Sequence, residues 1–258
     1  MKTWLLPGLM SLFITPLNAA PACQISSPEQ QAALLELYTS EGCSSCPPTE
    51  AWLARLSEAD YPPRQLIPIA LHVDYWDDLG WKDPFAKAAF TQRQKHHAQR
   101  NHSKTIYTPQ LVLNGKDLRP RSRLESELKA TSMHAPLQIN LSAQYANNHQ
   151  ITLTTQLSST KGNTPDDTRL YIAIAENGLS SSVKAGENTG RTLLHSHVVR
   201  RMIGPLPAQA QTTTSLQIEP DWVRNQLELI AFAESSDGKL LQAVRLGLAD
   251  AGCAMPSL

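Results

Sequence analysis

Outside its first residues, the sequence lacks long hydrophobic runs, an excess of charge of either sign, and more than four cysteines. Its 23 lysine and arginine residues balance 23 aspartate and glutamate residues, so we expect no broad basic surface and no nucleic-acid partner. A membrane-spanning helix needs about 20 apolar residues, and no such stretch follows the N-terminal segment. The mature chain is therefore expected to have no membrane span.

The N-terminal segment has the order of charge and hydrophobicity typical of a secretory signal peptide. Lys2 supplies a positive charge, residues 4–17 are mostly apolar, and Asn18-Ala19-Ala20 ends the segment in small residues. We therefore assign residues 1–20 to a signal peptide and expect a periplasmic or secreted protein. Residues 20–23 are also superficially similar to a lipoprotein cleavage box, which leaves lipid attachment at Cys23 as the alternative.

The four cysteines fall into two groups by their positions. Cys43 and Cys46 are close neighbours, whereas Cys23 and Cys253 stand at the two ends of the mature chain. Four cysteines allow three pairings, and an exported protein can keep its disulfides oxidised. We expect a redox pair between Cys43 and Cys46 and a structural disulfide between Cys23 and Cys253.

Up to about residue 133, short apolar runs alternate with segments of helical pattern. Such alternation of strands and helices predicts an α/β layer structure. Asn114-Gly115 after the third run indicates a hairpin, and Asp83-Pro84 indicates a helix start. Strands are expected over residues 32–39, 66–73 and 108–113, and helices from the cysteines to about 60, over 83–100 and over 122–130.

After Pro136 the period of the apolar residues changes to two. Alternation of this kind, with turns between the segments, predicts an antiparallel, sandwich-like region. The strands are expected over residues 137–145, 151–157, 170–175, 227–233 and 240–246. The fold class expected for the chain is thus a thioredoxin-like α/β domain at 24–133, followed by a β-rich domain at 137–250.

The two central cysteines follow a buried strand and open a helix, as thiol–disulfide exchange chemistry requires. At that position, unsatisfied N–H groups and the helix dipole stabilise a thiolate at Cys43. A lowered pKa makes this thiolate the attacking sulfur, and Cys46 then resolves the mixed disulfide. We expect Cys43 to be the more exposed and the more acidic of the two thiols.

A second feature, Thr108-Pro109 at the start of a later strand, makes the sequence similar to the thioredoxin superfamily. Those proteins place a cis-proline opposite the first cysteine, and the resemblance assigns that place to Pro109, with Thr108 aligning the partner peptide. It also makes Glu36 the buried acid that relays the resolving proton, with a charged residue at a strand edge as the alternative. Gly42 stands where the superfamily usually has tryptophan, and Ser44-Ser45 replaces the usual Gly-Pro, which leaves the redox potential and direction open.

Over nearly the whole mature chain, the sequence also resembles a secreted family of uncharacterised proteins, domain of unknown function family 1223. The resemblance implies a thioredoxin-like fold and no established activity. The stretches that carry it are residues 36–48, 72–77, 80–85, 107–110, 190–193 and 198–200.

Several side chains near these motifs have two interpretations. Asp74, Tyr75, Trp76 and Trp81 line a peptide-binding groove or simply pack. His72 joins the two cysteines as a copper or zinc ligand, or is merely hydrogen-bonded, which we favour.

Histidines further along the chain are expected on the surface. His96 and His97 end a basic helix and should be solvated. His195 and His197 should lie on an exposed polar face, with a metal site as the alternative.

Together these features predict an exported thiol–disulfide oxidoreductase or redox-linked chaperone that uses Cys43 and Cys46. Its expected partners are cysteine-containing exported proteins or a redox partner protein, and no cofactor or resident metal is expected. The alternatives are a non-enzymatic binding protein with a structural disulfide, and a metal carrier that uses Cys43, Cys46 and His72.

Overall fold

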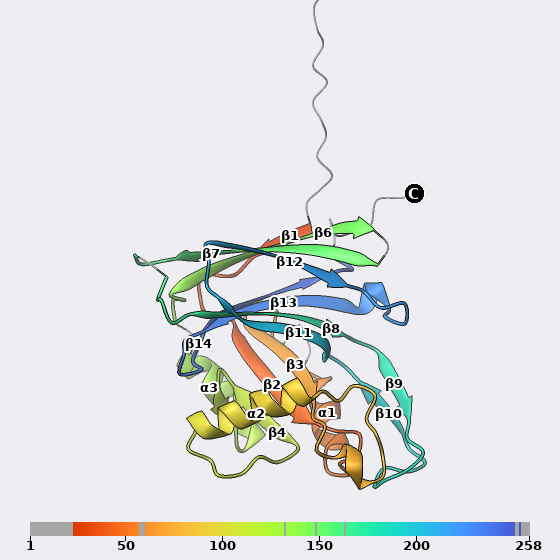
Figure 1. Ribbon diagram of the computed structural model, residues 1–258. Coiled ribbons are helices and arrows are strands. Elements are labelled where there is room, and N and C mark those ends of the chain that lie inside the picture. The colour runs from red at the N-terminus through yellow and green to blue at the C-terminus, as the bar shows by residue number, and fades with distance from the viewer. Residues whose placement is uncertain are drawn as a thin grey trace, which may run out of the picture.

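The computed structural model describes residues 23–56, 60–131, 133–147, 149–162, 164–250 and 253 (Figure 1). The predicted signal peptide, residues 1–20, lies outside the described residues. No helix within the described ranges is long and apolar enough to cross a membrane.

The larger of the two main sheets has eight strands. In order across the sheet they are β14 (Leu240–Gly247), β13 (Leu227–Glu234), β8 (Arg169–Glu176), β11 (Val198–Pro207), β3 (Leu66–His72), β2 (Ala33–Thr39), β4 (Gln110–Leu113) and β5 (Lys116–Asp117). β3 pairs in parallel with β2 and with β11, and the other pairs are antiparallel. β2, β3 and β13 are buried along their whole length, which explains their nearly continuous apolar sequences.

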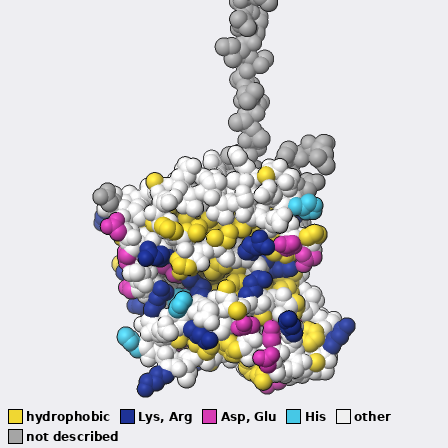
Figure 2. All heavy atoms as spheres, in the orientation of Figure 1, with side chains coloured by type: hydrophobic (Ala, Val, Ile, Leu, Met, Phe, Trp, Pro, Cys, Tyr) yellow, Lys and Arg dark blue, Asp and Glu magenta, His cyan; other side chains and the backbone are white. Residues whose placement is uncertain are grey.

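A second, four-stranded sheet lies above one half of the large sheet (Figure 1). It contains β1 (Cys23–Ser26), β6 (Leu137–Asn147), β7 (Gln150–Ser159) and β12 (Gln211–Gln217) in this order. Buried and exposed side chains alternate along much of β6 and β7, as expected for strands with one face in a core. That core includes Leu141, Leu153, Ile172 and Leu229, and Figure 2 shows hydrophobic side chains in a band between the two sheets.

Three α-helices cover the other half of the large sheet: α1 (Pro47–Leu53), α2 (Ala88–Arg100) and α3 (Leu124–Thr131). Leu53 of α1 and Leu128 of α3 pack in the same core cluster as Leu35. Phe90 of α2 packs in the cluster that contains Leu34. Because successive side chains of a strand point to opposite faces, α1 and α3 cover one face of β2 and α2 covers the other.

Short segments complete the chain. The 3₁₀ helices are η1 (Asp77–Leu79), η2 (Arg121–Arg123) and η3 (Arg224–Gln226). β9 (Leu179–Ser182) and β10 (Thr192–His195) form a two-stranded extension. This extension descends from the large sheet toward α1 and η1 (Figure 1), so the loop that joins β9 to β10 reaches the segment that follows β2.

The predicted fold class, an α/β thioredoxin-like domain followed by a sandwich-like region, is wrong. The described residues contain fourteen strands and three α-helices, so the protein is strand-rich, with a large mixed sheet and a second, antiparallel sheet. The physical reason lies in β11, where Val198 pairs in parallel with Ala70 of β3. Strands from the C-terminal half thereby extend the sheet that holds β2 to β5. The division into residues 24–133 and 137–250 stays a prediction.

The bounds of two helices also differ from the prediction. α2 begins at Ala88 rather than at Asp83. The Asp83 carboxylate accepts hydrogen bonds from the backbone N–H groups of Phe85 and Glu41, both at 2.8 Å, so this side chain joins two loops instead of capping α2. α1 ends at Leu53, several residues before the predicted end near residue 60.

The ends of the described chain are joined by a disulfide between Cys23 and Cys253, with a Cα–Cα distance of 4.4 Å and a sequence separation of 230. Cys23 opens β1, which pairs with β6 in the four-stranded sheet. Both cysteines are buried in the core between the two sheets. The bond therefore has the position expected of a structural disulfide.

Candidate functional site

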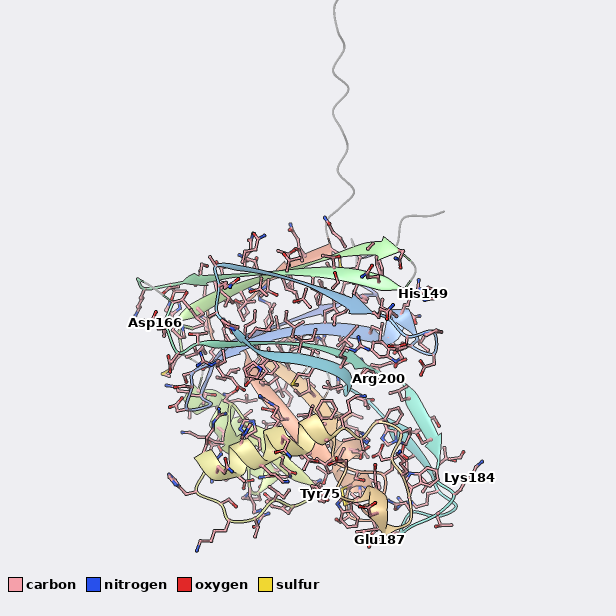
Figure 3. All side chains as sticks on the ribbon, in the orientation of Figure 1. Tyr75, His149, Asp166, Lys184, Glu187 and Arg200 are labelled. Carbon is pink, nitrogen blue, oxygen red and sulfur yellow. A yellow bond between two sulfur atoms is a disulfide. The ribbon has the colours of Figure 1, made fainter. Side chains whose placement is uncertain are left out.

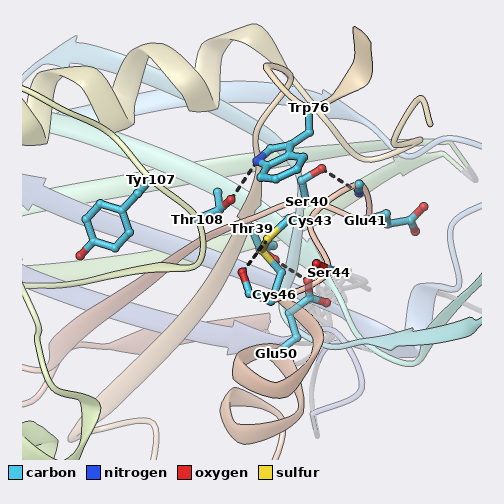
Figure 4. Close-up of a disulfide and its surroundings, with 12 residues drawn as sticks. Thr39, Ser40, Glu41, Cys43, Ser44, Cys46, Glu50, Trp76, Tyr107 and Thr108 are labelled. Carbon is cyan, nitrogen blue, oxygen red and sulfur yellow. Dashed lines mark hydrogen bonds between the residues drawn. A yellow bond between two sulfur atoms is a disulfide. The ribbon is translucent and has the colours of Figure 1, made fainter. Parts of the chain in front are cut away.

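Cys43 and Cys46 form a disulfide in the short segment between β2 and α1 (Figure 4). Cys46 is the residue before the first turn of α1, and Pro47 opens that turn. Both cysteines have an exposed fraction of 0%, whereas Ser44 and Ser45 between them are exposed. The two sulfurs are thus equally buried in this disulfide-bonded state, and the expectation that Cys43 is the more exposed and more acidic thiol stays a prediction for the reduced protein.

The loop that joins β9 to β10 contacts this segment. The buried Asn188 side chain donates hydrogen bonds to the backbone oxygens of Glu41 and Cys43, at 2.8 Å and 3.1 Å. The Glu187 carboxylate accepts a bond from the backbone N–H of Ser44 at 2.9 Å, and Glu187 lies at the end of this extension (Figure 3). The loop thus holds the disulfide segment through contacts made about 145 residues away in the sequence.

A hydroxyl group also contacts the disulfide directly. Ser45 Oγ lies 3.3 Å from Cys43 Sγ. A sulfur in a disulfide has no proton to give, so the Ser45 hydroxyl is the donor. The same donor would stabilise a thiolate at Cys43 after reduction.

Trp76 and Thr108 lie beside the disulfide (Figure 4). Trp76 Nε1 donates a hydrogen bond of 2.8 Å to Thr108 Oγ1, and the peptide bond between Thr108 and Pro109 is cis. A Cβ at Gly42 would lie 3.2 Å from Trp76 Cβ. Glycine before the first cysteine therefore lets Trp76 pack against the backbone of the disulfide segment.

The other residues predicted to line a groove are held by contacts within the chain. Asp74 Oδ1 accepts a bond of 2.5 Å from Thr91 Oγ1. The partly buried Tyr75 packs against the core cluster that contains Phe90. Trp81 Nε1 donates a bond of 2.7 Å to Glu41 Oε2. Of the four residues, Trp76 thus bonds directly to Thr108, and a peptide-binding role for the set stays a prediction.

Glu36 is bound in a buried ion cluster on the α2 side of β2. Arg93 Nε and Nη2 donate to its two carboxylate oxygens at 2.6 Å and 2.9 Å, and the Tyr38 hydroxyl donates at 2.8 Å. Burial alone would raise the pKa of Glu36, but Arg93 and His97 outweigh it and hold the pKa well below the usual range. A carboxylate held ionised in this way is a poor proton carrier, which argues against the relay expected of Glu36.

Two histidines expected on the surface are buried. His97 of α2 is 1% exposed, and its Nε2 lies 3.2 Å from Glu36 Oε1. His195 of β10 is 2% exposed, with Nδ1 at 2.5 Å from Glu50 Oε2 and Nε2 at 3.0 Å from Glu41 Oε1. Burial lowers the pKa of His195, but the bonds to Glu41 and Glu50 outweigh it and raise the pKa to about 9. Neither expectation of a solvated imidazole is correct.

His72 is hydrogen-bonded, in line with the interpretation favoured from the sequence. Its Nδ1 lies 2.7 Å from Asp83 Oδ2. The alternative of a metal carrier needs His72 together with free thiolates at Cys43 and Cys46. Both of those cysteines are disulfide-bonded. Neither of the two three-ligand clusters within the described residues includes a cysteine.

Local sequence pattern could reveal Cys43, Cys46 and Thr108-Pro109, but it gave no signal for Glu50, Asn188 or the burial of His195. Glu50 is one turn beyond Cys46 on α1, and its carboxylate faces the interior, where it accepts a hydrogen bond from Thr39. The importance of these residues depends on β10 and its loop approaching α1, a tertiary contact that periodicity does not encode.

The chain matches one family model and is similar in fold to several solved structures. Residues 34–234 match the family described as "Protein of unknown function (DUF1223)". The crystal structure of protein AGR_C_4864 from Agrobacterium tumefaciens is similar with a TM-score of 0.54 and 20% sequence identity, over 90% of this chain and 99% of that one. HBP35 of Porphyromonas gingivalis is similar with a TM-score of 0.63 and 15% identity, over 87% of this chain and 77% of that one. No curated relative matches the chain.

Proposed function

The chain belongs to the family described as protein of unknown function (DUF1223), and from that premise we propose that it is an exported thiol–disulfide exchange protein that acts through Cys43 and Cys46. The observation that carries the proposal is that the Cys43–Cys46 segment is held in place by contacts that do not depend on its disulfide. A cysteine pair of this kind can be opened and closed without loss of the surrounding structure.

Loop size argues against a purely structural role for this bond. Its two cysteines are separated by 3 positions, against 230 for Cys23 and Cys253. In the chain-entropy description, closing so short a loop stabilises a protein by about 2 kcal/mol, whereas the long loop gives about 5.5 kcal/mol. The short disulfide is therefore the one that the protein can lose more easily.

The hydrogen bonds around the segment should remain when the bond is reduced. Asn188 holds the backbone oxygens of Glu41 and Cys43, and Glu187 holds the N–H of Ser44. The backbone N–H of Cys46 donates to the oxygen of Cys43 at 3.2 Å. None of these bonds uses a sulfur atom, so the two thiols stay close together and the pair can close again rapidly.

The proposed exchange reaction assigns Cys43 as the sulfur that a partner attacks. A partner thiolate attacks Cys43 Sγ, the Cys43–Cys46 bond breaks, and Cys46 leaves as a thiolate. A second partner thiolate then attacks the partner sulfur of the mixed disulfide and releases Cys43. Two electrons pass from the partner dithiol to the cysteine pair, and two protons pass through solvent. In the reverse direction, Cys43 attacks a partner disulfide and Cys46 resolves the mixed disulfide.

The burial of both sulfurs restricts the partners. A partner must approach Cys43 at the exposed residues Ser44 and Ser45 or at Trp76 and Thr108, which lie beside the disulfide (Figure 4). An extended, cysteine-containing segment of an exported protein has the reach and the backbone groups to do this.

Replacing the resolving cysteine tests the proposal directly. In a Cys46→Ala variant produced with its N-terminal leader, we expect partner proteins to accumulate as mixed disulfides with Cys43, because no internal thiol releases them. Diagonal electrophoresis and mass spectrometry of the purified variant would identify these partners. The matched Cys43→Ala variant should trap far fewer, and equal trapping by the two variants would contradict the roles assigned here.

Removing the hydroxyl at position 45 should weaken the Cys43 thiolate. A hydrogen bond to a charged group stabilises it by about 1.5–3 kcal/mol, and one pKa unit corresponds to about 1.4 kcal/mol. We therefore expect Ser45→Ala to raise the pKa of the Cys43 thiol by about one unit, measured by the pH dependence of alkylation of the reduced protein. Ser44→Ala is the control, since Ser44 contacts Glu187, and an equal shift in both variants would exclude a specific Ser45–sulfur bond.

A further inference from the structure

Two buried histidines and one buried carboxylate converge where β3, β10 and α1 meet. Glu50, His72 and His195 each offer a ligand atom, and these atoms all lie within 4.8 Å of one another. We infer that these three residues form a binding site for a late divalent transition-metal ion such as Zn²⁺. The site is separate from the cysteine pair, so this inference goes beyond the proposed exchange function.

The outer contacts of the two imidazoles are those of metal-binding histidines. His72 Nδ1 is held by Asp83 Oδ2 at 2.7 Å, and His195 Nε2 is held by Glu41 Oε1 at 3.0 Å. Histidine ligands commonly donate their second ring N–H to a carboxylate, which fixes the ring and the tautomer. The nitrogens left for a metal are His72 Nε2 and His195 Nδ1, and the latter already lies beside the Glu50 carboxylate.

The free nitrogen of His72 points independently to a ligand. The side chain is 0% exposed, and its Nε2 has no hydrogen-bond partner among the described residues. A buried polar atom without a partner is costly, and a metal ion would supply that partner. Two imidazole nitrogens and a carboxylate oxygen are also a ligand set typical of zinc and related ions.

The charges in this cluster are suited to a divalent cation. Three buried carboxylates, from Glu41, Glu50 and Asp83, surround the two imidazoles. Metal ligation needs both imidazoles neutral. One divalent ion carries the same charge as two protons on the imidazoles, so replacing those protons by the ion leaves the net charge of the buried cluster unchanged.

A surface cavity lies near the site, beside Phe85. The Phe85 ring centroid is 5.3 Å from that of His72 and 5.4 Å from that of His195. Phe85 also lines this cavity of about 390 Å³, together with Arg200 and Trp222. Phe85 therefore lies next to both the cavity and the two imidazoles.

In the second three-ligand cluster of the described residues, a positively charged side chain already binds the carboxylates. Glu36, His97 and Glu234 also lie close together, but the Arg93 guanidinium already bonds to both carboxylates. That fixed cation takes the place of a metal ion. His97 is therefore a matched control, because it is a buried histidine beside carboxylates that should bind no metal.

The test is a titration of the mature, disulfide-intact protein with Co²⁺, followed by visible absorption, and with Zn²⁺, followed by calorimetry. We expect one equivalent of metal, a Co²⁺ spectrum without thiolate charge-transfer bands, and at least about a tenfold loss of affinity in His72→Gln and His195→Gln. The His97→Gln and Cys43→Ser/Cys46→Ser variants should bind as the wild type does, which separates this site from the redox proposal.

A measurement on the wild-type protein tests the inference even if the variants at the buried residues His72 and His195 do not fold. X-ray absorption of the one-equivalent Zn²⁺ complex should show two imidazole ligands and no sulfur. Sulfur ligation, fewer than two imidazoles, the absence of saturable binding, or undiminished binding by folded His72→Gln would each overturn the inference.

Discussion

The Arg93→Met variant should lose about 3–5 kcal/mol of unfolding free energy, because removing one partner of a buried ion pair leaves an uncompensated charge. Arg93 is 8% exposed and pairs with Glu36 and Glu234, which are 1% and 2% exposed. Its guanidinium also lies 4.8 Å from the ring centroid of Tyr171. Guanidinium chloride unfolding of the variant and the wild type would measure the loss.

Lowering the pH should reduce the difference in unfolding free energy between the Arg93→Met variant and the wild type. In the wild type, Arg93 and His97 hold the pKa of Glu36 well below its usual range. Its contribution to stability is therefore present above the unfolded pKa of about 4.3 and is lost as the pH falls toward the folded pKa. Without Arg93, burial raises the pKa of Glu36, so the variant takes up a proton in the folded state and gains stability relative to the wild type as the pH falls.

A triple variant controls for the volume change at position 93. Arg93→Met combined with Glu36→Gln and Glu234→Gln removes all three charges and should recover part of the lost stability. A loss below about 1 kcal/mol in Arg93→Met, or a loss that does not vary between pH 7 and pH 4, would contradict the role assigned to this ion cluster.

Opening the disulfide between Cys23 and Cys253 should have an effect of similar size. The bond closes a loop with a sequence separation of 230, and removing a native disulfide from an exported domain typically costs about 2–5 kcal/mol. The Cys23→Ser/Cys253→Ser variant should therefore unfold at clearly lower denaturant concentration. We expect the loss near the upper end of that range, because the loop includes nearly the whole described chain.

The central cysteine pair provides the matched comparison. Cys43→Ser/Cys46→Ser removes a bond that spans only 3 positions, so its loss of unfolding free energy should be about 2 kcal/mol or less. The reverse order, with the central pair contributing more than the terminal one, would show that the Cys43–Cys46 bond is structural.

Sequence pattern located the local elements of the fold well. The predicted strands at residues 32–39, 66–73 and 108–113 correspond to β2, β3 and β4, and Asn114-Gly115 does form the turn between β4 and β5. Continuous apolar runs and turn residues are local signals, so these predictions did not depend on what the segments pack against.

The arrangement of the strands could not be predicted in the same way. β11 contains Arg200, Arg201 and Gly204-Pro205, which interrupt the alternation of apolar and polar residues that indicates a strand. Its register also shifts twice against β8. Its parallel pairing with β3 joins segments more than 120 residues apart. Because apolar periodicity indicates which face of a strand is buried but not which strand lies beside it, the sequence did not reveal that segments from both halves of the chain share one sheet.

The candidate site shows the same limit. Cys43, Cys46 and Thr108-Pro109 are recognisable from their neighbours in the sequence, and the structure brings Trp76 to them through Thr108. Asn188 and His195 reach the site only through the β9–β10 extension. Glu36 was assigned by resemblance, but Arg93, which lies 57 positions away, determines its chemistry.

The most direct test of the exchange function is an equilibrium redox titration of the intact protein in buffers of graded thiol–disulfide ratio. Free thiols would be alkylated at each ratio and assigned by peptide mass spectrometry, while near-ultraviolet circular dichroism reports the tertiary structure. We expect Cys43 and Cys46 to become reduced reversibly while Cys23–Cys253 stays oxidised and the tertiary structure is unchanged. Reduction of both disulfides in a single step that coincides with unfolding would contradict the proposed exchange function.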